Sequence, residues 1–149
     1  MSKVQISVAP ATDHSVLNQL YLGWGYHGGI TDSDRVFVAH LDGCPVGLVR
    51  RTGESEVVML RGMYVAPEHQ RSGIGSRLLH AFAADLPAID CFCIPFAHLT
   101  GFYAQAGFSV IAETDAGAFL RERVRHYLAE GHDVLLMRRP AGTDRDRAS

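Results

Sequence analysis

Lysine is almost absent from this sequence, and a large net charge is absent with it. Lys3 is the only lysine, and 14 basic against 16 acidic residues give a formal net charge of −2. This balance excludes the basic surface that binding to nucleic acid or to an anionic membrane requires, so we expect neither partner and favour a small molecule. Long apolar runs are also missing: none approaches the roughly 18 residues of a membrane span, and no apolar stretch follows a basic start as in a secretory leader.

Cysteine is scarce as well. The three cysteines cannot all pair, and Cys91 and Cys93 lie two residues apart on one expected strand, where neither easily reaches the other. Unpaired thiols are typical of a cytoplasmic protein, which we therefore expect. The sequence has no H-x-x-x-H or C-x-x-C pair, so we predict no metal site. The histidines expected at exposed helix or loop positions are His14, His69, His80 and His132.

Two periodicities predict the secondary structure. Strands, indicated by alternation or by short apolar runs, are predicted over residues 4–8, 36–41, 45–50, 57–65, 89–94, 108–112 and 133–137. Helices, indicated by apolar residues three and four apart, are predicted from an N-cap at Thr12 and over residues 74–86, 99–106 and 119–131. The apolar positions of the first helix are Val16, Leu17, Leu20 and Tyr21.

The order of these elements indicates the fold class. Asp42-Gly43 predicts a tight hairpin turn, and Gly53 with its acidic neighbours predicts a second turn. Strands and helices alternate in the centre of the chain with hairpins outside it, which indicates an α/β fold with a mixed sheet, classed as α+β in some schemes. The length suits one domain, which we place at residues 1–139, with residues 140–149 as a flexible tail.

Two glycines open the helix that follows the strand at 57–65. Glycine costs about 1 kcal/mol relative to alanine inside a helix, so Gly73 and Gly75 need a reason. The first N–H groups of a helix lack internal partners and carry the positive end of its dipole, and glycine lets a ligand approach the backbone closely. The junction is therefore predicted to bind a phosphate or pyrophosphate.

Three phosphate-binding motifs compete for this junction. A P-loop requires a Gly-Lys pair, which the sequence does not have, and a dinucleotide-binding fingerprint requires a glycine where Leu78 stands. The third motif, Q/R-x-x-G-x-G/A after a strand ending V-x-P, is matched by residues 65–67 and 70–75, and Y-x-x-x-G-F is matched by residues 103–108. In these motifs, and in the order of elements over residues 3–137, the chain resembles the GNAT superfamily of N-acetyltransferases.

The resemblance implies a fold and a cofactor. The fold would be a GNAT-like mixed, mostly antiparallel sheet of about seven strands flanked by helices, with an extra helix before the last strand. The cofactor would be acetyl-CoA, and Gly62 fits the bulge that the family carries in its fourth strand. The pantetheine and thioester would lie along Met63, Tyr64 and Val65. The pyrophosphate would be held by Gln70, Arg71, Ser72, Gly73, Ile74, Gly75 and Ser76.

The resemblance also implies direct attack of an acceptor amine on the thioester. The backbone N–H near Met63 would donate to the developing oxyanion, and Tyr103 would be the acid for the leaving thiolate. A phenol has an ordinary pKa near 10, so it holds its proton at neutral pH. Tyr103 also shares an apolar face with Leu99 and Phe102, which is typical of core packing, and both roles can hold together.

The general base is less well defined. The family's fourth-strand carboxylate would stand at Met59, which has none. Glu54 and Glu56, acting through water, are the base candidates, with Glu113 and His27 as further ones; each also fits a solvated strand end or loop. Phe96 stands where relatives frequently carry an asparagine that touches the cofactor. The helix over 119–131 fits a surface helix, a cap on the acceptor site or a homodimer face.

The acceptor site is expected in the glycine- and aromatic-rich loop at 23–29. Trp24, Tyr26 and His27 would line it, or would instead fill the core. Arg61 would clamp an acceptor carboxylate if it points inward and would be solvated if it points outward. We therefore expect an acetyl-CoA-dependent N-acetyltransferase acting on a primary amine of a small molecule, amino acid or peptide. The alternatives are a non-catalytic acyl-CoA-binding regulator and an enzyme that modifies proteins.

Overall fold

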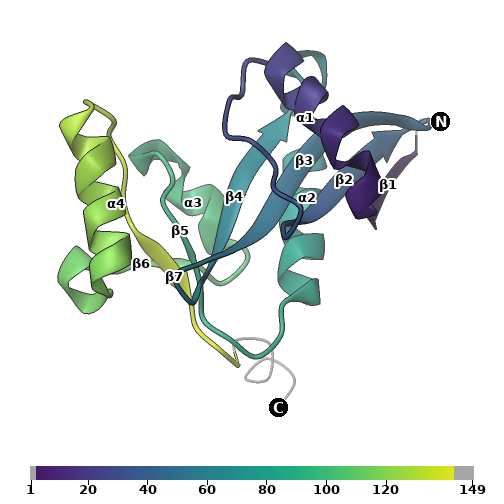
Figure 1. The fold of residues 1–149 in the computed structure, drawn as a ribbon. Helices are drawn as coiled ribbons and strands as arrows, with labels where there is room; N and C mark the ends of the chain where they lie inside the picture. Colours follow the sequence, from purple (N-terminus) through teal and green to yellow (C-terminus); the bar gives the residue numbers. More distant parts are fainter. Residues whose placement is uncertain (1–2, 143–149) are drawn as a thin grey trace. The chain divides into compact units, whose positions relative to one another are not determined.

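The computed structural model describes residues 3–142 and contains one seven-stranded sheet with the strand order β1-β2-β3-β4-β5-β7-β6 (Figure 1). The strands are β1 (Val4–Val8), β2 (Arg35–Leu41), β3 (Cys44–Glu54), β4 (Val57–Val65), β5 (Cys91–Cys93), β6 (Ser109–Val110) and β7 (Met137–Arg139). The α-helices are α1 (His14–Gly23), α2 (Ile74–Asp85), α3 (Thr100–Ala104) and α4 (Ala118–Ala129). The sheet is mostly antiparallel and flanked by helices, as expected, with β4 and β5 as a parallel pair.

The chain forms two compact units, and the residues of β4 are divided between them. Unit 1 comprises Met1–Gly53 and Leu60–Leu86, and unit 2 comprises Glu54–Met59 and Pro87–Ser149. Residues 143–149, most of the predicted tail, lie outside the described part of the chain. No helix of the described residues is both long and apolar enough to cross a membrane.

Unit 1 is built on β2, whose residues are buried on both faces of the sheet. Val36 and Val38 pack with Leu17 and Tyr21 of α1, whereas the Phe37 ring lies 5.5 Å from the Phe82 ring of α2. Successive residues of a strand point to opposite faces, so the continuous apolar run of β2 is explained by a helix on each side.

Three local details in the first 56 residues differ from the prediction. The first helix begins at His14 and not after an N-cap at Thr12, because Ala11–Asp13 form a 3-10 turn in which the Asp13 amide donates to the Pro10 carbonyl over 2.9 Å. Val16, one of the four apolar positions of this helix, is 63% exposed and does not belong to the core. Gly53 lies within β3, and the turn falls on Ser55 and Glu56, which have φ of 49° and 64°.

The predicted hairpin turn is confirmed, and it shows the same backbone geometry as the turn after β3. Asp42 and Gly43 have φ of 51° and 85°, the positive values that a tight two-residue hairpin requires. At Ser55 and Glu56 the same conformation is adopted by residues with a Cβ, so no glycine marks these two turn positions in the sequence.

Unit 2 contains β5, β6, β7, α3, α4 and the first residues of β4. Val58 and Met59 pair in parallel with Cys91 and Phe92. The helix α4 buries Leu120 and Val124 in a cluster with Met59 and Leu136. One stripe of α4 is therefore buried, as expected of a surface helix.

The last strand is displaced from its predicted position at 133–137 and runs over Met137–Arg139. The preceding residues bond to two different neighbours: the Leu135 amide donates to the Pro95 carbonyl over 3.0 Å, and the Leu136 carbonyl accepts from the Ile111 amide over 3.0 Å. Val134 forms only an isolated bridge with Phe96, and continuous pairing begins at Met137, which pairs with Cys93 of β5 and with Val110 of β6.

Candidate functional site

The loop after β4 is shaped by its own polar groups. Pro67–His69 form a 3-10 turn, and Arg71 has a φ of 65°, unusual for a residue with a side chain. The Gln70 side-chain amide donates to the Val65 carbonyl over 2.9 Å, and the Ser72 hydroxyl donates to the His69 carbonyl. Gln70 and Ser72, two of the predicted pyrophosphate ligands, thus also fix the course of the loop.

The start of α2 leaves backbone donors without a side-chain cap. Gly73 is the N-cap residue with a φ of 86°, and it makes no side-chain cap hydrogen bond. A Cβ on Gly73 would have no atom within 4 Å, so the space beside it is open. Ile74 is buried and anchors the helix, while Gly75 and Ser76 are half-buried. Because the first helical N–H groups have no intrahelical acceptor, this arrangement suits a phosphate group.

The second half of β4 is half-buried, in contrast to the two residues that precede it. Met59 and Leu60 are buried, whereas residues 61–65 are each partly accessible. Gly62 has a φ of 67°, which departs from extended backbone at the position where a bulge is predicted. The peptide groups of Met63, Tyr64 and Val65, the predicted pantetheine ligands, follow directly after this irregular residue.

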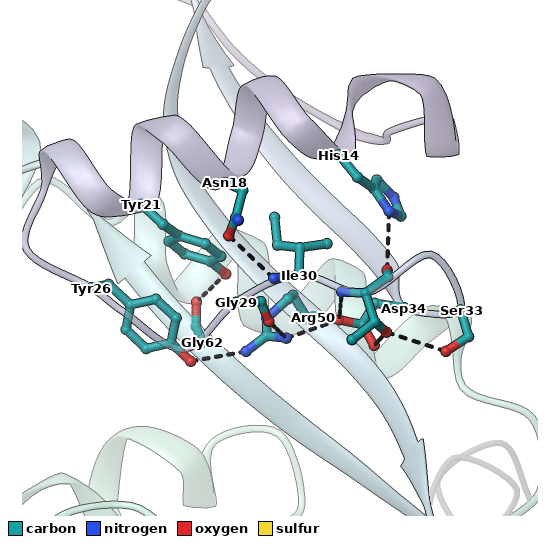
Figure 2. A network of polar contacts seen from close by, with 11 residues as sticks. His14, Asn18, Tyr21, Tyr26, Gly29, Ile30, Ser33, Asp34, Arg50 and Gly62 are labelled. Carbon is teal, nitrogen blue, oxygen red and sulfur yellow. Dashed lines mark hydrogen bonds and ion pairs between the residues drawn. The ribbon is translucent and has the colours of Figure 1, made fainter.

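Figure 2 shows a buried polar network that surrounds Gly62 and joins α1, β3 and the loop at 25–34. The Tyr21 hydroxyl of α1 donates to the Gly62 carbonyl over 2.7 Å, and Tyr21 is completely buried. Burial raises the pKa of Tyr21 above the ordinary tyrosine value, although the nearby Arg50 opposes the shift. The Tyr21 hydroxyl therefore keeps its proton and remains a hydrogen-bond donor.

Arg50 of β3 is the centre of this network, with 2% of its surface exposed. Its Nη1 donates to Asp34 over 2.8 Å and to the Gly29 carbonyl over 2.6 Å, and its Nη2 donates to the Tyr26 hydroxyl over 2.9 Å. Burial works against the charge of Arg50, but Tyr26, Tyr21 and Asp34 outweigh it and raise its pKa. The loop at 25–34 is thus tied to the sheet by a buried ion pair.

Sequence reasoning missed Arg50, although a signal was present. The residue ends the apolar run from Val46 to Val49, where a charge is seldom buried without a partner. Arg61, the charged residue in the middle of β4, is half-buried. The partner of Arg50 was not predictable, because Asp34 is 16 residues away in a segment without periodicity.

The aromatic residues of unit 1 pack mainly against one another. The Trp24 ring stacks on the Tyr64 ring at 5.9 Å, and the Tyr64 hydroxyl donates to the Trp24 carbonyl over 2.7 Å. The Tyr26 ring lies 4.5 Å from the Tyr21 ring. His27 is exposed, and Trp24 and Tyr26 are half-buried, so these three side chains keep accessible surface in one loop.

Tyr103 lies in unit 2 on the short helix α3. It is buried, and its ring contacts Phe102 and Phe108 edge to face at 5.0 and 6.2 Å. Gly107 follows the helix with a φ of 94°, the left-handed conformation expected of a residue that ends a helix. The core-packing role of Tyr103 is therefore present in the structure, and its role as an acid stays a prediction.

The carboxylates considered as bases differ in their surroundings. Glu54 accepts a hydrogen bond from the Arg123 guanidinium over 2.8 Å, and Glu113 accepts one from Arg125 over 2.9 Å. Glu56 is exposed in the turn after β3. Met59 is 2% exposed and belongs to the apolar cluster of unit 2.

The remaining predicted features concern cysteines, histidines and Phe96. No disulfide joins the three cysteines, and burial, with a smaller effect of Cys91, raises the pKa of the Cys93 thiol.

His14 is buried at 5% exposure and its Nδ1 lies 3.2 Å from the Thr31 carbonyl oxygen, so the expectation that it is exposed was wrong. Phe96 is 48% exposed. The described residues contain no group of three His, Cys, Asp or Glu arranged to hold a metal ion.

Comparison with models of protein families identifies the family to which this chain belongs. Residues 32–110 match the model of the acetyltransferase (GNAT) domain, and this match covers more than half of the chain. The chain belongs to the GNAT acetyltransferase family, as its motifs predicted. A search of curated proteins found no match.

Solved structures share the fold at low sequence identity. The ribosomal-protein-S18-alanine N-acetyltransferase of Escherichia coli is 16% identical, with a TM-score of 0.66 over 93% of this chain and 94% of its own. A GNAT acetyltransferase of Streptococcus pneumoniae is 18% identical, with a TM-score of 0.59 over 91% and 98%. N-acetylglutamate synthase of Neisseria gonorrhoeae, determined with coenzyme A and N-acetyl-glutamate, is 18% identical, with a TM-score of 0.65 over 92% of this chain. This chain spans 35% of that protein's length.

Proposed function

We propose that this protein is an acetyl-CoA-dependent N-acetyltransferase that transfers an acetyl group to a primary amine of a small molecule, amino acid or peptide. The observation that carries the proposal is the start of α2. Within the GNAT domain, a strand leads through a compact loop to a helix whose first N–H groups have no side-chain cap and whose N-cap is an open glycine. This is the arrangement that a pyrophosphate group requires.

The loop and β4 bind the donor in this proposal. Backbone N–H groups from Arg71 to Ser76 hold the pyrophosphate, and the half-exposed peptide groups of Met63 to Val65 bind the pantetheine arm. The gonococcal synthase, which shares the fold, was determined with coenzyme A, and this supports the donor proposed here. Arg71 is exposed and can add its charge to the phosphate contacts.

The proposed reaction is a direct transfer. The amine nitrogen bonds to the thioester carbon, the carbon–sulfur bond breaks, the thiolate receives a proton from Tyr103, and the amine loses one to a base. The Met63 N–H donates to the carbonyl oxygen as its negative charge develops. Glu54 and Glu56 remain the base candidates, acting through water, and Glu54 would do so while bound to Arg123.

The acceptor is proposed to bind beside the loop at 25–34. Trp24, Tyr26 and His27 keep accessible surface there, and Arg61 on β4 is half-buried, so it can meet an acceptor carboxylate. A cytoplasmic location, and a homodimer formed through α4, belong to the same proposal and rest on the sequence pattern.

One observation favours a second function, a non-catalytic acyl-CoA-binding regulator. The strand position of the family's carboxylate is occupied by buried Met59, and Glu54, the last residue of β3, is held by Arg123. Such a protein would keep the uncapped helix start and bind acetyl-CoA without transferring the acetyl group.

Turnover separates the two functions. The purified protein is incubated with acetyl-CoA and a panel of amines, amino acids and peptide N-termini, and coenzyme A release is followed with a thiol reagent. The enzyme proposal predicts acceptor-dependent thiol release, with acetylated product identified by mass spectrometry. Binding of acetyl-CoA with no release on any acceptor would favour the regulator, and no binding would contradict both.

A further inference from the structure

The hydrogen bond from the Tyr21 hydroxyl to the Gly62 carbonyl acts on the peptide group that joins Gly62 to Met63. The Gly62 carbonyl and the Met63 N–H belong to one planar trans peptide unit, so they point in opposite directions. Tyr21 donates to the carbonyl over 2.7 Å, the usual distance of a strong O–H···O bond. Holding the carbonyl on the Tyr21 side therefore aims the Met63 N–H away from α1.

The surroundings leave this peptide little freedom. A Cβ on Gly62 would lie 2.6 Å from the Tyr21 hydroxyl and 2.9 Å from the Arg50 Nε. Both side chains therefore occupy the space beside the Gly62 backbone. The Arg50 Nε is buried and has no hydrogen-bond partner among the described residues, although both Nη atoms are bonded. Arg50 also lies over the Tyr21 ring, 5.8 Å from its centroid. Figure 2 shows Tyr21 and Arg50 converging on Gly62.

We propose that Tyr21 is a positioning residue that orients and polarises the Gly62–Met63 peptide so that the Met63 N–H can stabilise the thioester oxygen. The inference rests on the proposed function, which assigns the oxyanion donor to Met63. A hydrogen bond accepted by a peptide carbonyl polarises the whole amide and strengthens its N–H as a donor. Tyr21 thus acts through the backbone and touches no reacting atom.

Infrared spectroscopy tests this directly. Acetyl-CoA labelled with carbon-13 at the thioester carbonyl is bound to the wild type and to Tyr21→Phe, which keeps the ring and removes the hydroxyl. In the wild type the carbonyl band is expected below its position for free acetyl-CoA, because the Met63 N–H donates to it. In Tyr21→Phe the band should move back toward the free position.

Kinetics and binding give a second readout. Turnover of Tyr21→Phe should fall about tenfold or more, because an oriented oxyanion donor contributes to kcat. The Kd of coenzyme A without its acetyl group should change less than about twofold, since that ligand has no thioester carbonyl. The control is Ser7→Ala, which removes a hydroxyl from exposed Ser7 of β1 and should leave both the band and the turnover unchanged.

The outcomes separate the role of Tyr21 from the assignment of the oxyanion donor to Met63. A lowered band in the wild type that stays lowered in Tyr21→Phe would overturn the role of Tyr21 and leave the Met63 assignment intact. A band at the free position in the wild type would overturn the Met63 assignment and this inference together. If Tyr21→Phe does not fold, 3-fluorotyrosine in place of Tyr21 keeps the hydroxyl as a stronger donor and should lower the band further; an unchanged band would overturn the inference.

Discussion

At the scale of single residues, Gly62 shows how a local departure from strand geometry is fixed by its neighbours. Its φ of 67° is unfavourable for any residue with a Cβ, and Tyr21 and Arg50 occupy the space that a Cβ would need. The sequence allowed a bulge at this glycine to be predicted. It did not reveal the two side chains that hold it, because Tyr21 and Arg50 are 41 and 12 residues away in the chain.

Replacement of Gly62 by alanine should therefore cost more stability than replacement of Gly73. Both residues have positive φ, of 67° and 86°, but only Gly62 lacks room for a methyl group. We expect Gly73→Ala to lose about 1–2 kcal/mol and Gly62→Ala to lose a further 1–3 kcal/mol, roughly, through overpacking. Urea denaturation of both variants measures the difference, and equal losses would show that the contacts at Gly62 relax freely.

Tyr103→Phe isolates the hydroxyl of the proposed acid. The ring contacts with Phe102 and Phe108 do not involve the hydroxyl, so they should persist. Turnover is expected to fall by about a hundredfold or more, with little change in the Kd of acetyl-CoA. A variant with wild-type kcat would contradict the assignment and leave Tyr103 as a core residue.

At the scale of elements, α2 and the loop at 25–34 place the candidate groups. The strand β4 was predicted with its observed bounds, and the glycine entry to α2 was recognised, because both are local patterns. The start of α1 and the position of β7 were missed because they depend on a 3-10 turn and on the pairing of β7 with β5 and β6. Such features arise from tertiary contacts, which residue spacing does not encode.

A carboxylate in the first turn of α2 should change stability and binding in opposite directions. In Ser76→Asp the new charge meets the positive end of the helix dipole, which stabilises the helix by about 0.3–1 kcal/mol. The same charge repels a pyrophosphate, so the Kd of acetyl-CoA should rise about tenfold or more. Thermal unfolding and calorimetric titration measure the two effects.

The control carries the same charge at the other end of the helix. Ala84 is exposed in the last turn of α2, where Ala84→Asp should slightly destabilise the helix and leave the Kd unchanged. Equal effects of the two variants on binding would show that the ligand does not use the start of α2.

The loop at 25–34 depends on a buried charge pair. Asp34→Asn removes the anion beside Arg50, whose guanidinium stays buried with only neutral partners, and we expect a loss of about 3 kcal/mol of unfolding free energy. Asp85→Asn is the matched control, because Asp85 pairs with Arg35 over 2.6 Å at the surface and its loss should cost below about 1 kcal/mol. Similar losses measured in urea for the two variants would contradict the importance of the buried pair.

At the scale of the whole molecule, the GNAT domain match at 32–110 includes residues of both compact units. The predicted pyrophosphate loop, the oxyanion donor and the aromatic loop belong to unit 1, and Tyr103 belongs to unit 2. The element order and two motifs were sufficient to predict the family and the fold. The base and the acceptor were not predictable, because exposed carboxylates and aromatic residues in loops carry no periodic signal that distinguishes function from solvation.

Calorimetric titration of the protein with acetyl-CoA and with acetyl-pantetheine, which lacks the pyrophosphate, tests the central claim most directly. If the loop before α2 holds the pyrophosphate, acetyl-CoA should bind at least about a hundredfold more tightly, since two or more charge-assisted hydrogen bonds are lost with the truncated ligand. Equal affinity for the two ligands, or no binding of acetyl-CoA, would contradict the account.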